Sequence, residues 1–234
     1  MWSGPRNLST AMMYAFAARG DCAVSDEPFY AAYLAATGLD HPMRAEILAS
    51  QSQDPMRVAA MCEGPFPQEK THSYMKHMTH HMIDGFPLGW ARHRTNVFLI
   101  RHPARVVASY AKKRQDPTLE DLGFAQQSRL FGEFAGWGAA PLVIDSTDIR
   151  AAPGPMLRKL CDAIGVDYTP AMLHWPAGGN PADGIWAAHW YGAVHRSTGF
   201  EAAEGPLPEL TGQYAELVEA ALPHYLALAS RKIG

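Results

Sequence analysis

The feature that most constrains the fold is an almost uninterrupted apolar run at residues 96–100 (NVFLI), which ends abruptly at Arg101. A strand with one face in solvent alternates apolar and polar residues, whereas a strand covered on both faces is apolar throughout. The run therefore predicts a central strand of a parallel sheet. A second run of this kind occupies residues 141–145 and ends at Asp145. Two such strands require helices on both faces of one sheet.

Shorter strands and helices alternate along the rest of the chain. Strands are also predicted at residues 1–3, 22–25 and 73–78. Helices are predicted at residues 9–19, 28–37, 103–113, 120–134 and 155–164, with shorter helical pieces within 40–64. A C-terminal helix has an apolar face from Tyr214 to Leu226, and Pro223 should kink it. This alternation predicts an α/β fold, a three-layer α/β/α arrangement with a central, mostly parallel sheet. We expect residues 1–234 to form a single domain. Ligands of such sheets bind beyond the carboxyl ends of the strands.

The first loop of the chain has the composition of a phosphate-binding turn. A very short predicted strand is followed by Gly-Pro, a basic residue and a Ser-Thr pair that opens a helix. Amides at a helix N-terminus carry partial positive charge, and hydroxyl and guanidinium groups add donors for an anion. The candidate phosphate-binding residues are Gly4, Pro5, Arg6, Asn7, Leu8, Ser9 and Thr10. The alternative is that Ser9 only caps the helix and the Gly-Pro pair only turns the chain.

This loop is not a Walker A loop. Counted from Gly4, that motif requires a second glycine and then a lysine at the positions held by Ser9 and Thr10. Arg101, rather than an aspartate for magnesium, follows the strand at residues 96–100. A P-loop kinase or nucleotide hydrolase is therefore the weaker alternative.

Two motifs together resemble the sulfotransferase family, whose members use 3′-phosphoadenylyl sulfate (PAPS) as donor. Residues 5–10 (PRNLST) are similar to the family's loop for the 5′-phosphosulfate, and residues 98–110 (FLIRHPARVVASY) are similar to its strand-to-helix signature. The resemblance implies a P-loop nucleotide-binding fold in which Arg101 and Ser109 hold the 3′-phosphate. It also implies adenosine 3′,5′-bisphosphate as the product and no required metal. The chain departs from the family at Leu8, where a glycine is common, and near Arg6, where a lysine is frequent.

The chemistry of sulfuryl transfer directs attention to acidic residues near the loop. Transfer to a hydroxyl requires positioning, charge stabilisation on the leaving oxygen and a base for the acceptor proton. Glu27 follows the second predicted strand and is similar to the glutamate of the family's Glu-Pro element, so it is the candidate base, with Asp26 as the next choice. The alternative is that Glu27 is a surface carboxylate in the first turn of a helix.

A lysine and further bases are expected on the third predicted strand. Lys76 and His77 resemble the family strand whose lysine contacts the bridging oxygen and whose nearby histidine can act as a base. Lys70-Thr71-His72 matches the family's Lys-Thr-His more literally and remains an alternative. The catalytic candidates are Glu27, Lys76, Arg6 and His77, with His72 as a further possible base.

Two later groups of residues are also candidates. His77, His80 and His81 lie close together, but neither an H-E-x-x-H pattern nor a nearby cysteine accompanies them, so polar side chains of a substrate cleft are favoured over a metal site. Residues 184–200 are dense in aromatic side chains, which are usually core. Arg196, in the basic loop at the end of this segment, is a candidate for the 3′-phosphate by resemblance to a late loop of the family.

Net charge and cysteine content limit the kinds of binding partner and the cellular compartment that we expect. The chain carries 20 Lys and Arg against 23 Asp and Glu, a net charge of −3, which does not point to nucleic acid or an acidic membrane surface. Three widely spaced cysteines, and the lack of a long apolar run or a recognisable signal peptide, favour a cytoplasmic protein. The expected partners are a nucleotide donor and a small-molecule acceptor.

The sequence thus predicts an enzyme that transfers a sulfuryl group from PAPS to a hydroxyl or amine of a small-molecule or carbohydrate acceptor. The alternatives are a P-loop kinase or nucleotide hydrolase, and a non-catalytic nucleotide-binding member of the sulfotransferase fold. Neither the acceptor nor the oligomeric state can be read from the sequence.

Overall fold

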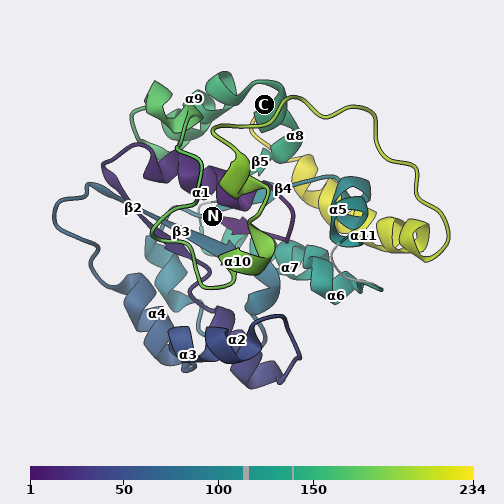
Figure 1. Ribbon diagram of the computed structural model, residues 1–234, viewed down its shortest axis with the longest axis horizontal. Coiled ribbons are helices and arrows are strands. Elements are labelled where there is room, and N and C mark those ends of the chain that lie inside the picture. Colours follow the sequence, from purple (N-terminus) through teal and green to yellow (C-terminus); the bar gives the residue numbers. More distant parts are fainter. Residues whose placement is uncertain (113–115, 139) are drawn as a thin grey trace.

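A computed structural model describes residues 1–112, 116–138 and 140–234 of the chain (Figure 1). Five strands form one all-parallel sheet in the order β2-β3-β1-β4-β5. Their bounds are β1 Trp2–Ser3, β2 Cys22–Asp26, β3 His72–Met78, β4 Val97–Ile100 and β5 Leu142–Asp145. The predicted α/β class with a parallel central sheet is confirmed.

Helices flank this sheet on both sides (Figure 1). The α-helices are α1 Ser9–Ala17, α2 Tyr30–Thr37, α3 Arg44–Ser50, α4 Pro55–Glu63, α5 Pro103–Tyr110, α6 Leu119–Leu122, α7 Phe124–Ala135, α8 Ser146–Ala151, α9 Pro153–Ile164, α10 Ala187–Trp190 and α11 Gln213–Ala229. Short 3₁₀ helices are η1 Thr79–His81, η2 Gly89–His93, η3 Pro170–Leu173 and η4 Val194–Arg196. Among the described residues, no helix combines the length and apolar character needed to cross a bilayer.

The packing of β4 explains why its sequence is apolar throughout. Val97 and Leu99 belong to the core between the sheet and helices α1 and α9. Phe98 and Ile100 belong to the core on the opposite face, which α4, α7 and the C-terminal part of α11 complete. All four side chains are buried. Successive residues of a strand point to opposite faces, so a strand covered on both sides needs apolar residues at every position.

The predicted helix over residues 120–134 is wrong as a single element. The helix divides into α6 and α7 at Gly123, whose φ of 70° lies in the left-handed region that glycine adopts without strain. Smaller corrections are that α1 ends at Ala17, that α2 begins at Tyr30 after a turn at Pro28 and Phe29, and that α9 begins at Pro153. The helix predicted to reach residue 113 also ends earlier, because α5 stops at Tyr110 and residues 111 and 112 form a turn; residue 113 itself lies outside the described residues.

The two-residue strand β1 holds the first loop at the middle of the sheet. Trp2 pairs with His77 of β3 on one side and with Phe98 of β4 on the other. The loop that follows therefore leaves the sheet between the carboxyl ends of β3 and β4. Because neighbouring strands of a parallel sheet end at the same edge, the loops after β2, β3, β4 and β5 surround it.

Candidate active site

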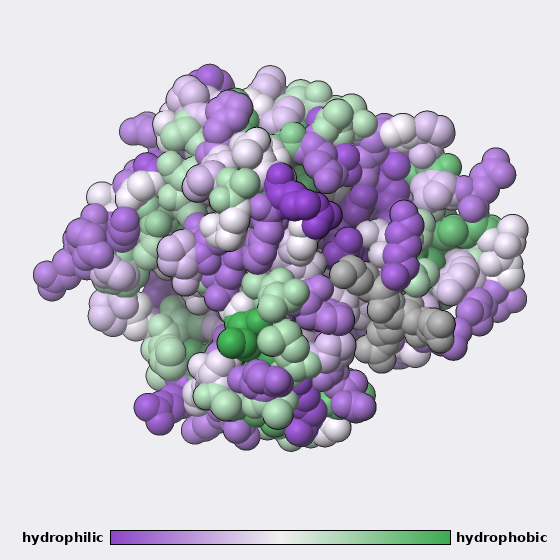
Figure 2. Space-filling model, viewed as in Figure 1, coloured by the Kyte–Doolittle hydropathy of each residue, from purple (hydrophilic) through white to green (hydrophobic). Residues whose placement is uncertain are grey.

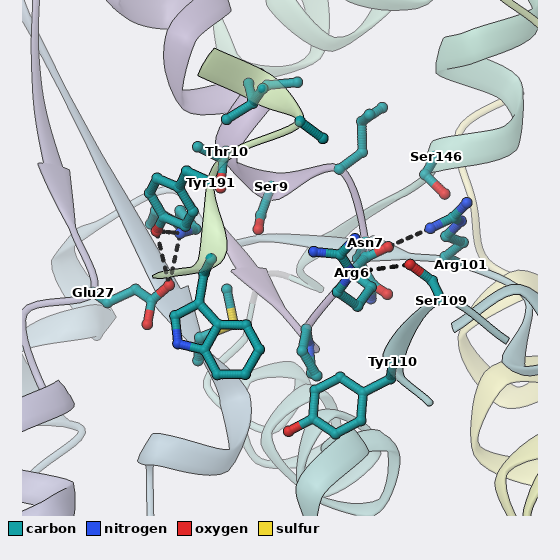
Figure 3. A pocket seen from close by; sticks show the side chains of 18 of the residues that line it. Arg6, Asn7, Ser9, Thr10, Glu27, Arg101, Ser109, Tyr110, Ser146 and Tyr191 are labelled. Atoms are coloured by element: carbon teal, nitrogen blue, oxygen red, sulfur yellow. Dashed lines mark hydrogen bonds and ion pairs between the residues drawn. The ribbon is translucent and has the colours of Figure 1, made fainter. Parts of the chain in front are cut away.

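A cavity of about 260 Å³ lies at the carboxyl edge of the sheet. Its walls come from the first loop, the ends of β2, β3 and β4, helix α5, the start of α8, and the segment from Trp190 to Glu201 that crosses the strand ends. Figure 3 shows its two ends: Arg6, Arg101 and Ser109 lie on one side, and Glu27 and Tyr191 on the other. Ser9 and Thr10 lie between them.

The first loop presents the N-terminus of α1 to the cavity. The N-cap residue is Leu8, whose side chain cannot accept a hydrogen bond from the first-turn amides, and no acidic residue occupies that turn. Ser9 is the first helical residue, so the interpretation that Ser9 caps the helix is wrong. Uncapped amides and an absence of negative charge make this helix end suitable for an anion.

The backbone of this loop is unusual. Arg6 and Leu8 have φ values of 61° and 73°, in the left-handed region that residues other than glycine rarely adopt. Gly4 has a different role, because a Cβ atom there would lie 2.6 Å from the carbonyl oxygen of Leu122. Asn7 secures the loop from beneath by donating a hydrogen bond of 3.2 Å to the carbonyl of Leu99. The loop is therefore held in one shape against the end of β4.

The two motifs of the sequence meet at one end of the cavity. Arg6 Nε donates to Ser109 Oγ at 2.9 Å, and Arg101 Nη1 donates to the carbonyl of Arg6 at 2.5 Å. Burial and the neighbouring Arg101 charge lower the pKa of Arg6 below its usual value. Two guanidinium groups, a hydroxyl and a helix N-terminus converge there, which is a donor set suited to phosphate groups.

The opposite end of the cavity contains a buried cluster of two carboxylates and one lysine. Lys76 Nζ lies 2.8 Å from Asp26 Oδ1 and 2.7 Å from Glu27 Oε1. The side chains of Lys76 and Asp26 are each 1% exposed and that of Glu27 is 8% exposed. Burial alone would lower the pKa of Lys76, but Asp26 and Glu27 outweigh it and raise that pKa. Lys76 therefore stays charged at neutral pH.

Glu27 is strained and electrostatically perturbed. Its φ of 40° is unusual for a residue other than glycine, and its amide is fixed by a 2.9 Å hydrogen bond to the Lys76 carbonyl. Burial raises the pKa of Glu27, and Lys76 opposes that rise. Strained backbone and shifted pKa values concentrate at functional sites. A carboxyl with a raised pKa is suited to accept a proton near neutral pH.

Tyr191 connects the C-terminal part of the chain to this cluster. Its hydroxyl contacts Lys76 Nζ, lies 3.1 Å from Glu27 Oε1 and 2.9 Å from Asp26 Oδ2, and accepts a 2.9 Å hydrogen bond from Trp186 Nε1. Burial, together with the charges of Glu27 and Asp26, raises the pKa of Tyr191 well above its usual value, so the hydroxyl keeps its proton. Glu27 Oε1 is thereby occupied by Lys76, and the single proton of the Tyr191 hydroxyl can be donated to only one of the two carboxylates.

The second oxygen of Glu27 points toward a histidine. Glu27 Oε2 lies 3.9 Å from His81 Nδ1, a distance too long for a hydrogen bond. Nδ1 of His81 is buried and has no hydrogen-bond partner among the described residues. The His81 ring stacks between Tyr30 and Tyr33, with centroid distances of 4.4 and 4.8 Å. Burial lowers the pKa of His81 well below its usual value, so the ring is neutral.

Comparison with known proteins decides the family. The sequence model of the Sulfotransferase domain matches residues 1–232. The chain belongs to the sulfotransferase family. Two relatives from Arabidopsis thaliana, branched-chain-amino-acid aminotransferase-like proteins 1 and 2, are 35% identical over 230 residues and 34% identical over 225 residues. The matches cover 98% and 96% of this chain but only 41% and 40% of the relatives, so the chain spans about two fifths of their length.

A solved structure shows that the fold is shared. The sulfotransferase domain from the curacin biosynthetic pathway superposes with a TM-score of 0.60 at 16% sequence identity, over 95% of each chain. At that identity the likeness establishes the fold of this sulfotransferase domain and not its substrates.

The structure brings most of the expected residues to this cavity and leaves others away from it. Those that line it are Pro5, Arg6, Asn7, Leu8, Ser9, Thr10, Glu27, Lys76, Arg101 and Ser109. Gly4 packs closely against the Leu122 carbonyl and does not line the cavity, and Arg196 belongs to η4 and does not line it either. His80 and His81 line the cavity, and the described residues contain no group of histidine, cysteine and acidic side chains arranged to hold a metal.

His77 lies on the opposite face of β3 from Lys76. It stacks on Trp2 with a centroid distance of 4.5 Å and is buried, and burial lowers its pKa well below the usual value. Adjacent residues of a strand point in opposite directions, so Lys76 and His77 cannot both reach the site. The alternative Lys70-Thr71-His72 is at the other end of β3, where Lys70 Nζ donates to the Gly20 carbonyl and His72 approaches Asp21 at 3.8 Å.

Sequence reasoning missed several residues of the site. Tyr191 is one of many aromatic residues in residues 184–200, and His81 is expected only as one of several polar side chains of a substrate cleft, without a role of its own. Arg150 also lines the cavity, from the helix after β5. No local pattern distinguishes these residues, because each reaches the site through packing between segments distant in the sequence.

Proposed function

We propose that this sulfotransferase transfers a sulfuryl group from 3′-phosphoadenylyl sulfate to a hydroxyl group of a small-molecule acceptor. The observation that carries the proposal is that one cavity joins an anion-binding end, built from the first loop with Arg101 and Ser109, to a proton-accepting end at Glu27. A reaction between an anionic donor and a neutral hydroxyl needs these two ends in one cavity.

The anion-binding end fits a donor with phosphate groups at two positions. The N-terminus of α1, with Ser9, Thr10 and Arg6, would hold the 5′-phosphosulfate, and Arg101 and Ser109 the 3′-phosphate. When bound, the donor supplies the sulfuryl group to be transferred. The amides of α1 and the Arg6 guanidinium would stabilise the negative charge that develops on the leaving side.

The other end would prepare the acceptor. Lys76 occupies Glu27 Oε1, so Glu27 Oε2 remains for the acceptor hydroxyl. A hydroxyl oxygen at about 2.8 Å from Glu27 Oε2 can also lie about 2.8 Å from His81 Nδ1, because those two atoms are 3.9 Å apart. Glu27 would take the hydroxyl proton and His81 would orient the oxygen. In this arrangement Lys76 favours the ionised form of Glu27 and opposes the rise in pKa that burial causes.

The test is calorimetric titration with adenosine 3′,5′-bisphosphate, compared with ADP and with ATP plus magnesium. We expect preferential binding of the bisphosphate at micromolar concentration, about 8 kcal/mol of binding free energy. Arg101→Ala should remove that preference. Binding of ATP with magnesium alone would instead favour a P-loop kinase or nucleotide hydrolase.

One observation favours a second candidate, a non-catalytic nucleotide-binding protein. Lys76 and Glu27 are already paired with each other, as in a structural ion pair. Glu27→Gln separates nucleotide binding from catalysis, because it should leave binding of the bisphosphate intact and remove sulfuryl transfer. A protein that binds the bisphosphate but sulfurylates no member of a panel of alcohols, phenols, sugars and amines would support the second candidate.

Two further statements remain proposals. The three cysteines, Cys22, Cys62 and Cys161, are free and buried, which supports a reducing compartment such as the cytoplasm. The aminotransferase-like name describes relatives of which this chain spans about two fifths, and we propose no aminotransferase activity for it.

A further inference from the structure

Three arginines, of which Arg101 and Arg150 line the cavity, converge on one glutamate. Glu204 forms ion pairs with Arg101 through Oε1, with Arg105 Nε at 3.1 Å and with Arg150 Nη1 at 3.0 Å. The Glu204 side chain is only 5% exposed. Burial alone would raise the pKa of Glu204, but the three arginines outweigh it and lower that pKa. Glu204 is therefore an ionised carboxylate inside a cationic cluster.

Glu204 lies on a segment that the arginines themselves hold in place. We call residues 201–206 the strap; they precede α11 in the long yellow-green loop of Figure 1 and contain neither helix nor strand. Arg105 Nη2 donates to the Gly205 carbonyl at 2.5 Å, and Arg150 Nε donates to the Ala202 carbonyl at 3.0 Å. In the same view, hydrophilic side chains gather across the middle of the molecule between the positions of α1 and α5 (Figure 2). Arginine side chains thus bind both the carboxylates and the backbone carbonyls of the strap.

The charges of this cluster do not balance. Three guanidinium groups face the single carboxylate of Glu204, and the only other carboxylate of the strap, Glu201, lies 3.0 Å from Arg150 Nη2. A phosphate monoester has a charge of about −1.5 to −2 near pH 7 and three strong acceptor oxygens. It is therefore a stronger partner for several guanidinium groups than one carboxylate.

Arg101 already uses both of its terminal nitrogens, whereas its buried Nε has no hydrogen-bond partner among the described residues. Its Nη1 donates to the Arg6 carbonyl, and its Nη2 is paired with Glu204. The Arg6 contact fixes the first loop, whereas the Glu204 contact joins Arg101 to the strap. A phosphate that binds Arg101 bidentately through Nε and Nη2 would therefore displace Glu204 from Nη2 and leave the Arg6 contact in place.

We propose that Glu204 is an internal counter-anion that competes with the 3′-phosphate of the nucleotide for Arg101. This inference rests on the proposed function and adds to it a residue that sets nucleotide affinity. Binding of a nucleoside 3′,5′-bisphosphate displaces Glu204 from Arg101 and loosens the strap. A nucleotide without a 3′-phosphate leaves the pair in place. Glu204 thus lowers the affinity for every 3′-phosphorylated nucleotide, product included, and favours its release.

The experiment compares Glu204→Gln with the unaltered chain by calorimetry, using adenosine 3′,5′-bisphosphate and 5′-AMP as paired ligands. We expect Glu204→Gln to bind the bisphosphate about tenfold more tightly and 5′-AMP within about twofold of the original affinity. Glu133→Gln on α7 is the matched control, because it removes the same charge from a surface pair with Arg129 at 3.8 Å. It should change neither affinity.

A second measurement reads the strap directly. Hydrogen exchange of the amides of residues 202–205 should become faster in the unaltered chain when the bisphosphate binds, and should stay the same with 5′-AMP. Glu204→Gln should show the faster exchange without any ligand. Thermal unfolding of each variant establishes that it is folded before affinities are compared.

The outcomes separate this inference from the proposed function. Weaker bisphosphate binding by Glu204→Gln would mean that Glu204 organises the arginines for the phosphate, and would overturn the inference. An equal gain in affinity for 5′-AMP would also overturn the inference, because removing the charge of Glu204 would then strengthen the binding of any anionic nucleotide. If the unaltered chain does not prefer the bisphosphate to 5′-AMP but Glu204→Gln does, the inference holds. If neither prefers it, both proposals are wrong.

Discussion

Replacing Lys76 by methionine tests whether the buried cluster depends on its single positive charge. Methionine preserves the length and most of the volume of the lysine but leaves Asp26 and Glu27 without a counter-charge. Those carboxylates are 1% and 8% exposed, so water cannot take the place of the ammonium group. Removing one member of a buried ion pair typically costs about 3–5 kcal/mol of unfolding free energy. We expect a loss in that range for Lys76→Met at pH 7.

The loss of unfolding free energy in Lys76→Met should be larger at high pH than at low pH. Burial raises the pKa of Glu27 above its usual 4.5, and removal of Lys76 raises it further. The folded state then keeps a proton that the unfolded state releases. The resulting stability is fully present below the usual glutamate pKa and is lost as the pH rises through the raised pKa. The unfolding free energy of Lys76→Met should therefore recover as the pH falls from 8 to 5, by up to about 1.4 kcal/mol per pH unit for each retained proton.

The assay is urea denaturation of the unaltered chain and its variants at pH 8, 7, 6 and 5. Lys232→Met is the matched control: Lys232 Nζ lies 2.6 Å from Asp148 Oδ2, but the two side chains are 36% and 31% exposed. An exposed pair contributes about 1 kcal/mol or less, so this variant should be nearly neutral. If Lys76→Met loses no more than Lys232→Met at pH 8, or its loss does not change with pH, the reasoning is refuted.

Three other predictions concern single positions of the site. Leu8→Gly should be more stable than Leu8→Ala by about 1 kcal/mol in urea denaturation, because both variants lose the same packing but only glycine relieves a φ of 73°. This is the reverse of the usual order, in which alanine is more stable than glycine, and a more stable Leu8→Ala would contradict it. The kcat/KM of sulfuryl transfer should rise with pH through an acid limb above the usual glutamate pKa of 4.5, because Glu27 must be ionised. Glu27→Gln should remove that limb and lower kcat about 10²- to 10⁴-fold. If the limb is unchanged in Glu27→Gln, another group causes it. His81→Phe keeps the ring between Tyr30 and Tyr33 but removes Nδ1, so KM for the acceptor should rise about tenfold while bisphosphate affinity stays the same; an unchanged KM would place the acceptor hydroxyl elsewhere.

The structure also explains a departure of this chain from the family pattern. The resemblance places a glycine where this chain has Leu8, and the structure gives Leu8 the left-handed conformation that glycine adopts most easily. The side chain is partly buried and packs against the core beneath α1, which offsets part of the conformational cost. The chain thus keeps the loop shape without the residue that favours it.

Several properties of the protein were determined by local sequence. The apolar run at residues 96–100 required a strand covered on both faces, and the structure places its side chains alternately in two cores. Proline and glycine marked several helix ends correctly, for example at Gly38 and Gly165. The first loop and Arg101 could be assigned to one edge because every strand of a parallel sheet points the same way. These properties depend on backbone preferences and on the two faces of a strand, which act over a few residues.

Only the tertiary structure decided which side chains meet. Lys76 contacts carboxylates about 50 residues earlier and a tyrosine 115 residues later, and Arg101 meets Glu204 across 103 residues. Of the neighbours Lys76 and His77, the pairing of β3 between β2 and β1 turned the lysine toward the cavity and the histidine into the core. Such contacts depend on how whole elements pack, and the energy that fixes them is distributed over several hydrophobic core clusters. No short stretch of sequence contains that information, and so the partners of the charged residues could not be predicted from it.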